Sequence, residues 1–227
     1  MTKQIRSTFK HDLQVMQDDV LRMSSWLDSA IQRALRALAD RNADLARQVI
    51  ADDAQINAQR FHIEEACIRL IATQQPTASD LRAIVAAMNI ISDLERMADH
   101  AAGIARIVLR MGDEPLLKPL VDMPRMADIC RDMTHAALDA YVARDADAAK
   151  RVAARDDEVD NLYNQIFREL LSFMVEDPRT TSRALYLLFA AHNLERIGDR
   201  VTNIAERVIF MESGEMHELS AGPQAPI

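Results

Sequence analysis

The stretch "LERIGDRVTNIAERV", residues 194–208, decides the architecture, because the chain contains it twice. The stretch "LERMADHAAGIARIV" at 94–108 aligns with it without a gap, and both begin with Leu-Glu-Arg-x-x-Asp. The similarity continues upstream, where "DDAQIN" at 52–57 resembles "RDDEVD" at 155–160 at a slightly different offset. Self-similarity over this length predicts that the chain is a duplicated structural unit.

The composition predicts helices. The chain has 227 residues, of which 49% are hydrophobic, and this is enough to bury a core. It has only 5 Gly and 7 Pro, and aromatic residues make up 4%, so few turns and long elements are expected. Ala, Leu, Arg, Glu and Met are frequent, and these residues favour the α-helix.

The spacing of apolar residues and of breakers divides the chain into six long helices. Apolar residues recur at spacings of three and four, and clusters containing Pro, Gly or Asp interrupt them. The predicted helices cover about 6–39, a segment ending near 73, 78–111, 122–143, 145–175 and 180–212. We therefore predict an all-α fold of two tandem, pseudo-symmetric three-helix bundles, 1–113 and 114–212, followed by a flexible C-terminal tail, 213–227.

Charge and cysteine usage narrow the functional classes. The net charge of −8 gives no basic footprint for nucleic acid. Cys67 and Cys130 are far apart and lack partner spacing, so we expect buried thiols of a cytosolic protein and no disulfide framework. The first residues have no apolar signal core, and the longest apolar runs are too short to span a membrane. An intracellular protein without direct membrane insertion is expected.

The repeated carboxylates lie at the edge of the predicted core. On a helix, Glu195 and Asp199 fall at roughly 100–140° from the centre of the apolar stripe that contains Leu194, and Glu95 and Asp99 are equivalent. Two carboxylates four residues apart repel each other by a few tenths of a kcal/mol. Either a neighbouring arginine or a bound cation would offset this repulsion.

A metal ion is one of two interpretations of this pattern. Two carboxylates one turn apart supply half a site for a hard or borderline cation, and an adjacent helix must supply the rest. The acidic stretches at 52–57 and 155–160 are the obvious suppliers. A single Glu-x-x-x-Asp pair is usually a solvated helix face, but its duplication in register favours the metal interpretation.

Three functional classes remain open at this point: a non-enzymatic regulator, a metal-dependent enzyme that uses the carboxylates, and a helical scaffold with a solvated acidic face. We expect no enzyme, because there is no phosphate-binding glycine loop, no Ser/His/Asp arrangement and no recognisable general base. The carboxylates also lie at the bundle boundary and not around an enclosed pocket.

The stretch "QPTASDLR" at 75–82, together with the two Leu-Glu-Arg-x-x-Asp repeats, resembles the PhoU family over residues 5–212. The resemblance implies two three-helix bundles and a negative regulator of phosphate uptake and of the phosphate-starvation response. It implies that the ATPase subunit of the phosphate ABC transporter and a sensor histidine kinase are the partners. It also implies a homodimer in the cytoplasm, peripheral to the inner membrane through these partners.

The resemblance further implies multinuclear iron or zinc clusters, or another divalent metal, on the bundle surface. Carried over by position, the metal-binding residues are Glu95, Asp99, Glu195 and Asp199, with Asp53, Asp156 and Asp157 from the neighbouring helices. The repeats differ, because Arg106 stands where the second repeat has Glu206. The two sites are therefore expected to differ in metal affinity.

Overall fold

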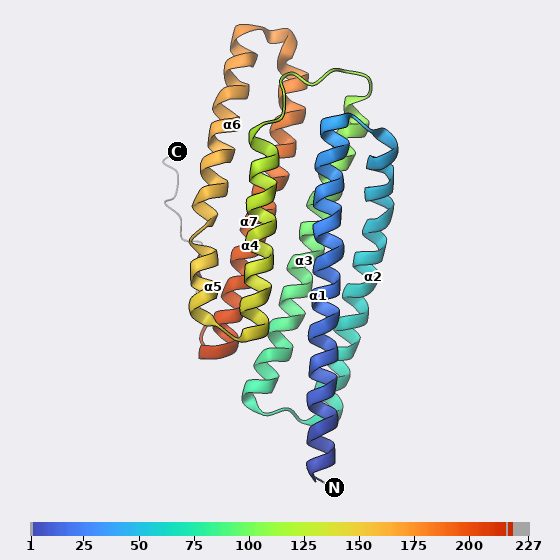
Figure 1. The fold of residues 1–227 in the computed structure, drawn as a ribbon, viewed down its shortest axis with the longest axis vertical. Helices are drawn as coiled ribbons and strands as arrows, with labels where there is room; N and C mark the ends of the chain where they lie inside the picture. Colours follow the sequence, from blue (N-terminus) through green and yellow to red (C-terminus); the bar gives the residue numbers. More distant parts are fainter. Residues whose placement is uncertain (1, 217, 220–227) are drawn as a thin grey trace.

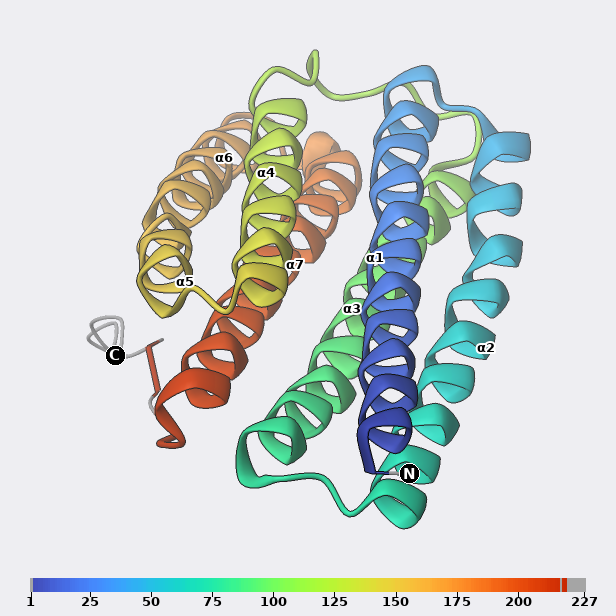
Figure 2. The same ribbon diagram turned by 60° about the horizontal axis from the view of Figure 1, so that its bottom comes forward.

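The computed structural model describes residues 2–216, 218 and 219, and within these it contains helices and no strand. The first bundle consists of α1 (Thr2–Asp40), α2 (Ala43–Gln74) and α3 (Ala78–Met111). The second consists of α4 (Asp122–Ala143), α5 (Ala146–Ala153), α6 (Asp156–Glu176), a 3-10 turn (Pro178–Thr180) and α7 (Thr181–Ser213). Figures 1 and 2 show the bundles side by side, joined by the segment 112–121. The predicted all-α fold of two three-helix units is confirmed, whereas the predicted boundary between 113 and 114 stays a prediction.

Local sequence signals explain four of the helix ends. The Leu45 N–H donates to Asn42 Oδ1 at 2.9 Å, and the Ala148 N–H donates to Asp145 Oδ1 at 2.8 Å, so both residues cap free amides of a first turn. Gly112 and Gly214 follow the ends of α3 and α7 with φ of 56° and 80°. These positive φ values favour glycine, which has no Cβ to clash with the backbone.

The fifth predicted helix, 145–175, is interrupted in the structure. Ala154 and Arg155 separate α5 from α6, although both have φ and ψ in the right-handed helical region. The residues at the interruption do not predict it, because neither alanine nor arginine is a helix breaker. The interruption makes Asp156, Asp157 and Glu158 the first turn of a new helix, where acidic side chains interact favourably with the helix dipole.

The two bundles pack against each other through α3 and α7, which run antiparallel in the middle of the molecule (Figures 1 and 2). Asp93 of α3 lies 3.5 Å from Arg200 Nη1, and its carboxylate accepts a hydrogen bond from Asn203 at 3.3 Å. One hundred residues on, Asn193 of α7 lies 3.0 Å from His100 Nδ1 and packs against Gly103. Position 93 of α3 therefore contacts positions 200 and 203 of α7, and the equivalent position 193 of α7 contacts positions 100 and 103 of α3. This reciprocity is what a pseudo-twofold axis requires.

The core confirms the predicted cysteine environment. Cys67 and Cys130 are buried and not bonded to each other, and burial raises the pKa of both thiols to about 12. Each thiol is therefore protonated at neutral pH and is a packing residue of its bundle.

The predicted flexible tail begins in an ordered segment. Ser213 is the last residue of α7, and the Leu219 N–H donates to Glu206 Oε1 at 2.7 Å. Positions 217 and 220–227 of the predicted tail lie outside the described residues. Nowhere between residues 2 and 219, position 217 aside, is there a helix with the length and apolar character of a membrane span.

Two acidic flanks as the candidate metal centre

The predicted site residues gather on two surfaces, one in each bundle. We call Asp53 of α2 with Glu95 and Asp99 of α3 the first acidic flank. The second acidic flank consists of Asp156, Asp157 and Asp160 of α6 with Glu195 and Asp199 of α7. The first flank lies where α2 packs against α3, and the second lies where α6 packs against α7. The carboxylates are half-buried or exposed and lie outside the apolar core, as their helix positions predict.

The second acidic flank brings five carboxylates together on two helices. Burial and the nearby carboxylates of Asp160, Asp199 and Asp157 together raise the pKa of Asp156 to about 7. Burial and Asp199 raise the pKa of Glu195 to about 7, although the guanidinium of Arg196 partly offsets them. Asp156 Oδ1 is buried and has no hydrogen-bond partner among the described residues. A buried carboxylate oxygen without a donor is costly, and a cation at this surface would relieve the cost.

Gly198 allows α6 and α7 to approach closely at this flank. A Cβ at this position would lie 3.1 Å from Val159 Cγ1 and 3.2 Å from Asp156 Oδ1. The first repeat has Ala98 at the equivalent position. Because Gly198 has no Cβ, the Asp156 carboxylate can lie against the backbone of α7, on the helix that carries Glu195 and Asp199.

Two residues of α7 also contact the carboxylates of the second acidic flank. Arg196 Nη1 donates to Asp199 Oδ2 at 2.6 Å, which makes this arginine an ion-pair partner, as predicted for one interpretation of the repeat. His192 Nδ1 lies 3.2 Å from Glu195 Oε2, without the geometry of a hydrogen bond. An imidazole at this distance can supply a nitrogen ligand next to the carboxylates.

Arginines moderate the first acidic flank. Arg106 Nη2 lies 4.0 Å from Asp99 Oδ1. Burial and Asp99 raise the pKa of Asp53, while Arg106 lowers it. Burial and Asp99 also raise the pKa of Glu95, and Arg60 lowers it. Arginines lie beside both flanks, but the first flank has three carboxylates and the second has five. The first flank therefore offers a metal ion less electrostatic stabilisation than the second.

The structure extends the list of predicted residues and alters one argument. Asp160 belongs to the acidic stretch expected to supply ligands, although it was not among the residues carried over from the family, and it interacts electrostatically with both Asp156 and Asp199. Glu206, expected as an additional carboxylate of the second site, instead accepts the Leu219 N–H. The difference between the flanks therefore depends on Arg106 and on the number of carboxylates, and it does not require Glu206.

The side chains do not form a finished metal cage. In residues 2–216, 218 and 219, no three His, Cys, Asp or Glu side chains converge closely enough to hold a metal ion. The unpartnered oxygen of Asp156 and the mutual repulsion of its neighbours nevertheless fit a cation. Binding would require surface carboxylates to rotate toward the ion.

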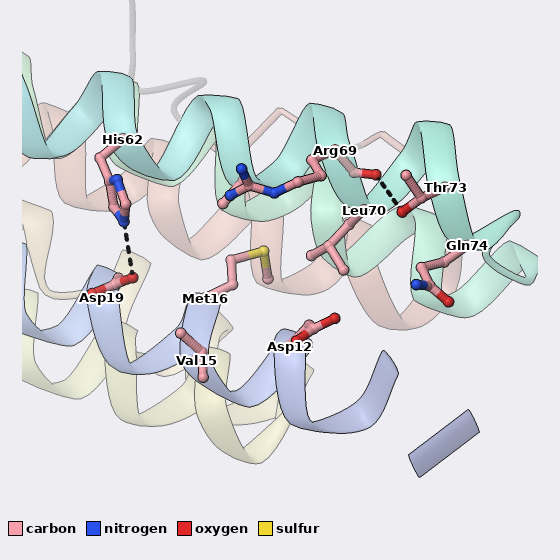
Figure 3. Close-up of a pocket in the computed structure, with 10 residues that line it drawn as sticks. Asp12, Val15, Met16, Asp19, His62, Arg69, Leu70, Thr73 and Gln74 are labelled. Atoms are coloured by element: carbon pink, nitrogen blue, oxygen red, sulfur yellow. Dashed lines mark hydrogen bonds and ion pairs between the residues drawn. The ribbon is translucent and has the colours of Figure 1, made fainter. Parts of the chain in front are cut away.

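A hollow of about 410 Å³ lies elsewhere, between α1 and α2 (Figure 3). Its walls combine apolar side chains with Asp12, Asp19, His62 and Arg69. Asp19 already accepts a hydrogen bond from Arg22 at 2.7 Å and lies 3.8 Å from His62. This hollow shares no residue with either acidic flank.

We expect the double substitution Asp99→Ala and Asp199→Ala to leave the helical content unchanged. Both side chains point away from the apolar core, with exposed fractions of 57% and 30%, so their removal creates no cavity. Far-UV circular dichroism checks this, with the buried Leu194→Ala as a variant expected to lose about 2–5 kcal/mol of stability. A large loss of helical signal in the double variant would contradict the placement of these residues.

Comparison with known proteins agrees with this architecture. A family model described as the PhoU domain matches residues 20–108 and again residues 123–208, one match in each bundle. The chain belongs to the PhoU family. The two matches coincide with the internal repeat, so the resemblance noted from the sequence is confirmed.

Relatives in the PhoU family cover almost the whole chain. The phosphate-specific transport system accessory protein PhoU homolog of Aquifex aeolicus is 40% identical over 90% of this chain and 93% of its own length. The PhoU accessory protein of Escherichia coli K12 is 35% identical over 95% and 89%. These relatives are named accessory proteins, which confirms that the family is regulatory and not enzymatic.

Solved structures of the family show the same fold. The phosphate transport system regulatory protein PhoU of Streptococcus pneumoniae superposes with a TM-score of 0.86 at 30% identity, covering 92% of this chain and 99% of that one. PhoU of Pseudomonas aeruginosa gives 0.85 at 38% identity, covering 91% and 100%. The arrangement of two PhoU domains is therefore shared.

Proposed function

We propose that this chain is a negative regulator of phosphate uptake and of the phosphate-starvation response. The observation that carries the proposal is the match of both bundles to the PhoU domain, with near-complete coverage by relatives named as accessory proteins of phosphate-specific transport. In the part of the chain that the structure describes, the acidic flanks are open surfaces, which disfavours a catalytic site at these carboxylates.

Such a regulator acts through contacts with other proteins. The partners that we propose are the ATPase subunit of the phosphate ABC transporter and the sensor histidine kinase of the phosphate response. The chain would meet them on the cytoplasmic side of the inner membrane, as a homodimer, without inserting into the lipid. Its acidic surface and net charge of −8 support protein partners and not nucleic acid.

The acidic flanks support a bound metal as part of this function. In the second flank, Asp156, Glu195 and Asp199 would hold the ion with Asp157, and Asp160 and His192 lie close enough to contribute. In the first flank, Asp53, Glu95 and Asp99 are the equivalent residues. A divalent iron or zinc ion would supply positive charge that links α2 to α3 in the first bundle and α6 to α7 in the second.

Deletion of the gene tests the regulatory role. With phosphate in excess, we expect a phosphate-starvation reporter to be expressed constitutively in the deletion strain and to be repressed again when the gene is restored. Because derepression can arise indirectly from altered uptake, the intracellular phosphate content is measured in parallel. Normal repression in the deletion strain would remove the basis of the proposal.

The substitution Arg106→Glu is expected to increase metal binding at the first acidic flank. It removes the guanidinium 4.0 Å from Asp99 and adds a carboxylate, which is the residue type that the second repeat has here. Metal analysis of the purified protein and calorimetric titration with zinc should show a higher stoichiometry or at least tenfold tighter binding. Arg110→Glu, one turn further along α3, is the matched charge control.

A further inference from the structure

The outer surface of α6 and α7 carries a group of exposed apolar side chains. Phe167 and Leu171 of α6 are 41% and 46% exposed, and Leu185 and Phe189 of α7 are 37% and 53% exposed. We call these four residues the apolar stripe. Because α6 and α7 run antiparallel and Tyr163 contacts His192, Phe167 lies at the level of Phe189 and Leu171 at the level of Leu185. Val175, 76% exposed, extends the stripe along α6.

The first bundle does not repeat the aromatic part of the stripe. The alignment that pairs Asp53 with Asp156 places Glu64 opposite Phe167, and the alignment of the Leu-Glu-Arg repeats places Asn89 opposite Phe189. In the first bundle this surface is a hollow of about 410 Å³ whose walls include Arg60, Glu64 and Asn89. Folding of a bundle therefore does not require phenylalanine at either position, and the aromatic part of the stripe is found in the second bundle alone.

The apolar stripe continues into the second acidic flank along the same helix pair. One turn beyond Phe167 and Phe189, the rings of Tyr163 and His192 lie 6.1 Å apart. Beyond them follow Asp160 and Glu195. A partner that covers the stripe therefore meets apolar side chains first and carboxylates within two helical turns.

The size of the stripe favours a single helix over a second copy of this chain. At roughly 150–200 Å² for a fully exposed large side chain, the stripe with Val175 leaves on the order of 400–500 Å² uncovered. A stable dimer of standard size buries about 800 Å² on each partner, whereas a patch of about 300–600 Å² is typical of a functional surface on a monomer.

We propose that the apolar stripe binds the apolar face of a basic amphipathic helix that belongs to a protein partner. Side chains at spacings of three, four and seven residues on that helix would pack on Phe167, Leu171, Leu185 and Phe189. Lysine or arginine residues at one end would face the second acidic flank. The same carboxylates repel an anionic lipid surface. This inference rests on the proposed function only in naming the transporter ATPase and the sensor kinase as proteins to be tested.

The test replaces two residues of the stripe by their counterparts in the first bundle. The double variant Phe167→Glu and Phe189→Asn should fold as the wild type does, because both side chains are about half exposed. Its Kd for the purified transporter ATPase subunit or the purified full-length sensor kinase should rise at least tenfold, since exposed aromatic anchors often dominate such interfaces. Phe61→Glu, at a residue of α2 that is 51% exposed, is the matched control and should leave the Kd unchanged.

A photo-crosslinker at position 185 identifies the occupant. The expected product joins position 185 to a helical segment of the ATPase subunit or the kinase that carries lysine or arginine. Crosslinks to a second copy of this chain, or flotation of the wild type with phosphatidylglycerol vesicles that the double variant loses, would overturn the proposal. An unchanged Kd for the double variant would overturn it as well, while the reporter result for the deletion strain would still decide the proposed function.

Discussion

Replacing Asp156 by Asn and Glu195 by Gln should make the metal-free protein more stable at pH 8 and abolish tight metal binding at the second acidic flank. Both groups have a pKa of about 7 in the folded protein, above the ordinary values of 3.8 and 4.5. Burial, and then repulsion from neighbouring carboxylates, therefore disfavours their ionised forms in the folded state more than in the unfolded state. The neutral amides keep the shape of both side chains and remove that repulsion.

The sign of the pH dependence follows from these raised pKa values. An acid with a raised folded-state pKa binds more protons when folded, so its destabilising effect is present above pH 7 and disappears as the pH falls toward 4. The metal-free wild type should therefore gain stability between pH 8 and pH 5. Both groups are half-buried and screened by solvent, so we expect a difference on the order of 1 kcal/mol. The double variant should show little pH dependence in this range.

Thermal unfolding with and without zinc measures both effects. A ligand that binds only the folded state stabilises the wild type by about 2.7 kcal/mol at a concentration one hundred times its Kd. The double variant should lose this gain, and Asp53→Asn with Glu95→Gln in the first flank should lose less. Equal loss in both double variants would show that the arginines of the first flank do not weaken it. A metal-free wild type that is less stable at pH 5 than at pH 8 would contradict the raised pKa values.

Gly103→Leu should destabilise the contact between the bundles more than any substitution in the flanks. A Cβ at residue 103 would lie 2.6 Å from Asn193 Oδ1, which is itself 3.0 Å from His100 Nδ1. A leucine needs more room than Asn193 can yield by rotation, so α3 and α7 must separate. Overpacking of this kind typically costs about 1–3 kcal/mol.

A double-mutant cycle separates the steric effect from helix propensity. Gly103→Ala adds only the Cβ and gains helix propensity, so its effect should be small. Combining Gly103→Leu with Asn193→Ala removes the obstructing side chain and should recover part of the lost stability. Chemical denaturation of the wild type, Gly103→Leu, Asn193→Ala and the double variant provides the four free energies of unfolding of the cycle. Independent, additive effects of the two substitutions would exclude the predicted clash.

Repetition and periodicity were sufficient to predict the fold. The spacing of apolar residues and the loop signals around Pro76, Gly112 and Pro178 placed most helix ends close to those in the structure. The interruption between α5 and α6 could not be predicted, because Ala154 and Arg155 have no propensity to end a helix. Three acids in succession from Asp156 onward were the only local hint, since acidic residues favour the first turn of a helix.

The positions of the carboxylates on the helices could be predicted, but the charged and polar groups that contact them could not. The four-residue spacing placed Glu195 and Asp199 together on a boundary surface of α7. The sequence alone could not show that Glu206 hydrogen-bonds to Leu219, or that Arg106 lies 4.0 Å from Asp99, because both depend on side-chain conformations. The close approach of α6 to Gly198 could not be predicted either, since it depends on how α6 is positioned against α7.

The pseudo-twofold contact between α3 and α7 has a consequence for the two halves as separate polypeptides. A pair of first halves would place Asp93 against His100 and Gly103, and a pair of second halves would place Asn193 against Arg200 and Asn203. The second arrangement puts an asparagine where the observed packing has a glycine, and neither retains the pairing of Asp93 with Arg200. Co-expressed halves should therefore assemble with each other in preference to themselves, so the duplicated unit has become a pair of non-identical, mutually selective subunits on one chain.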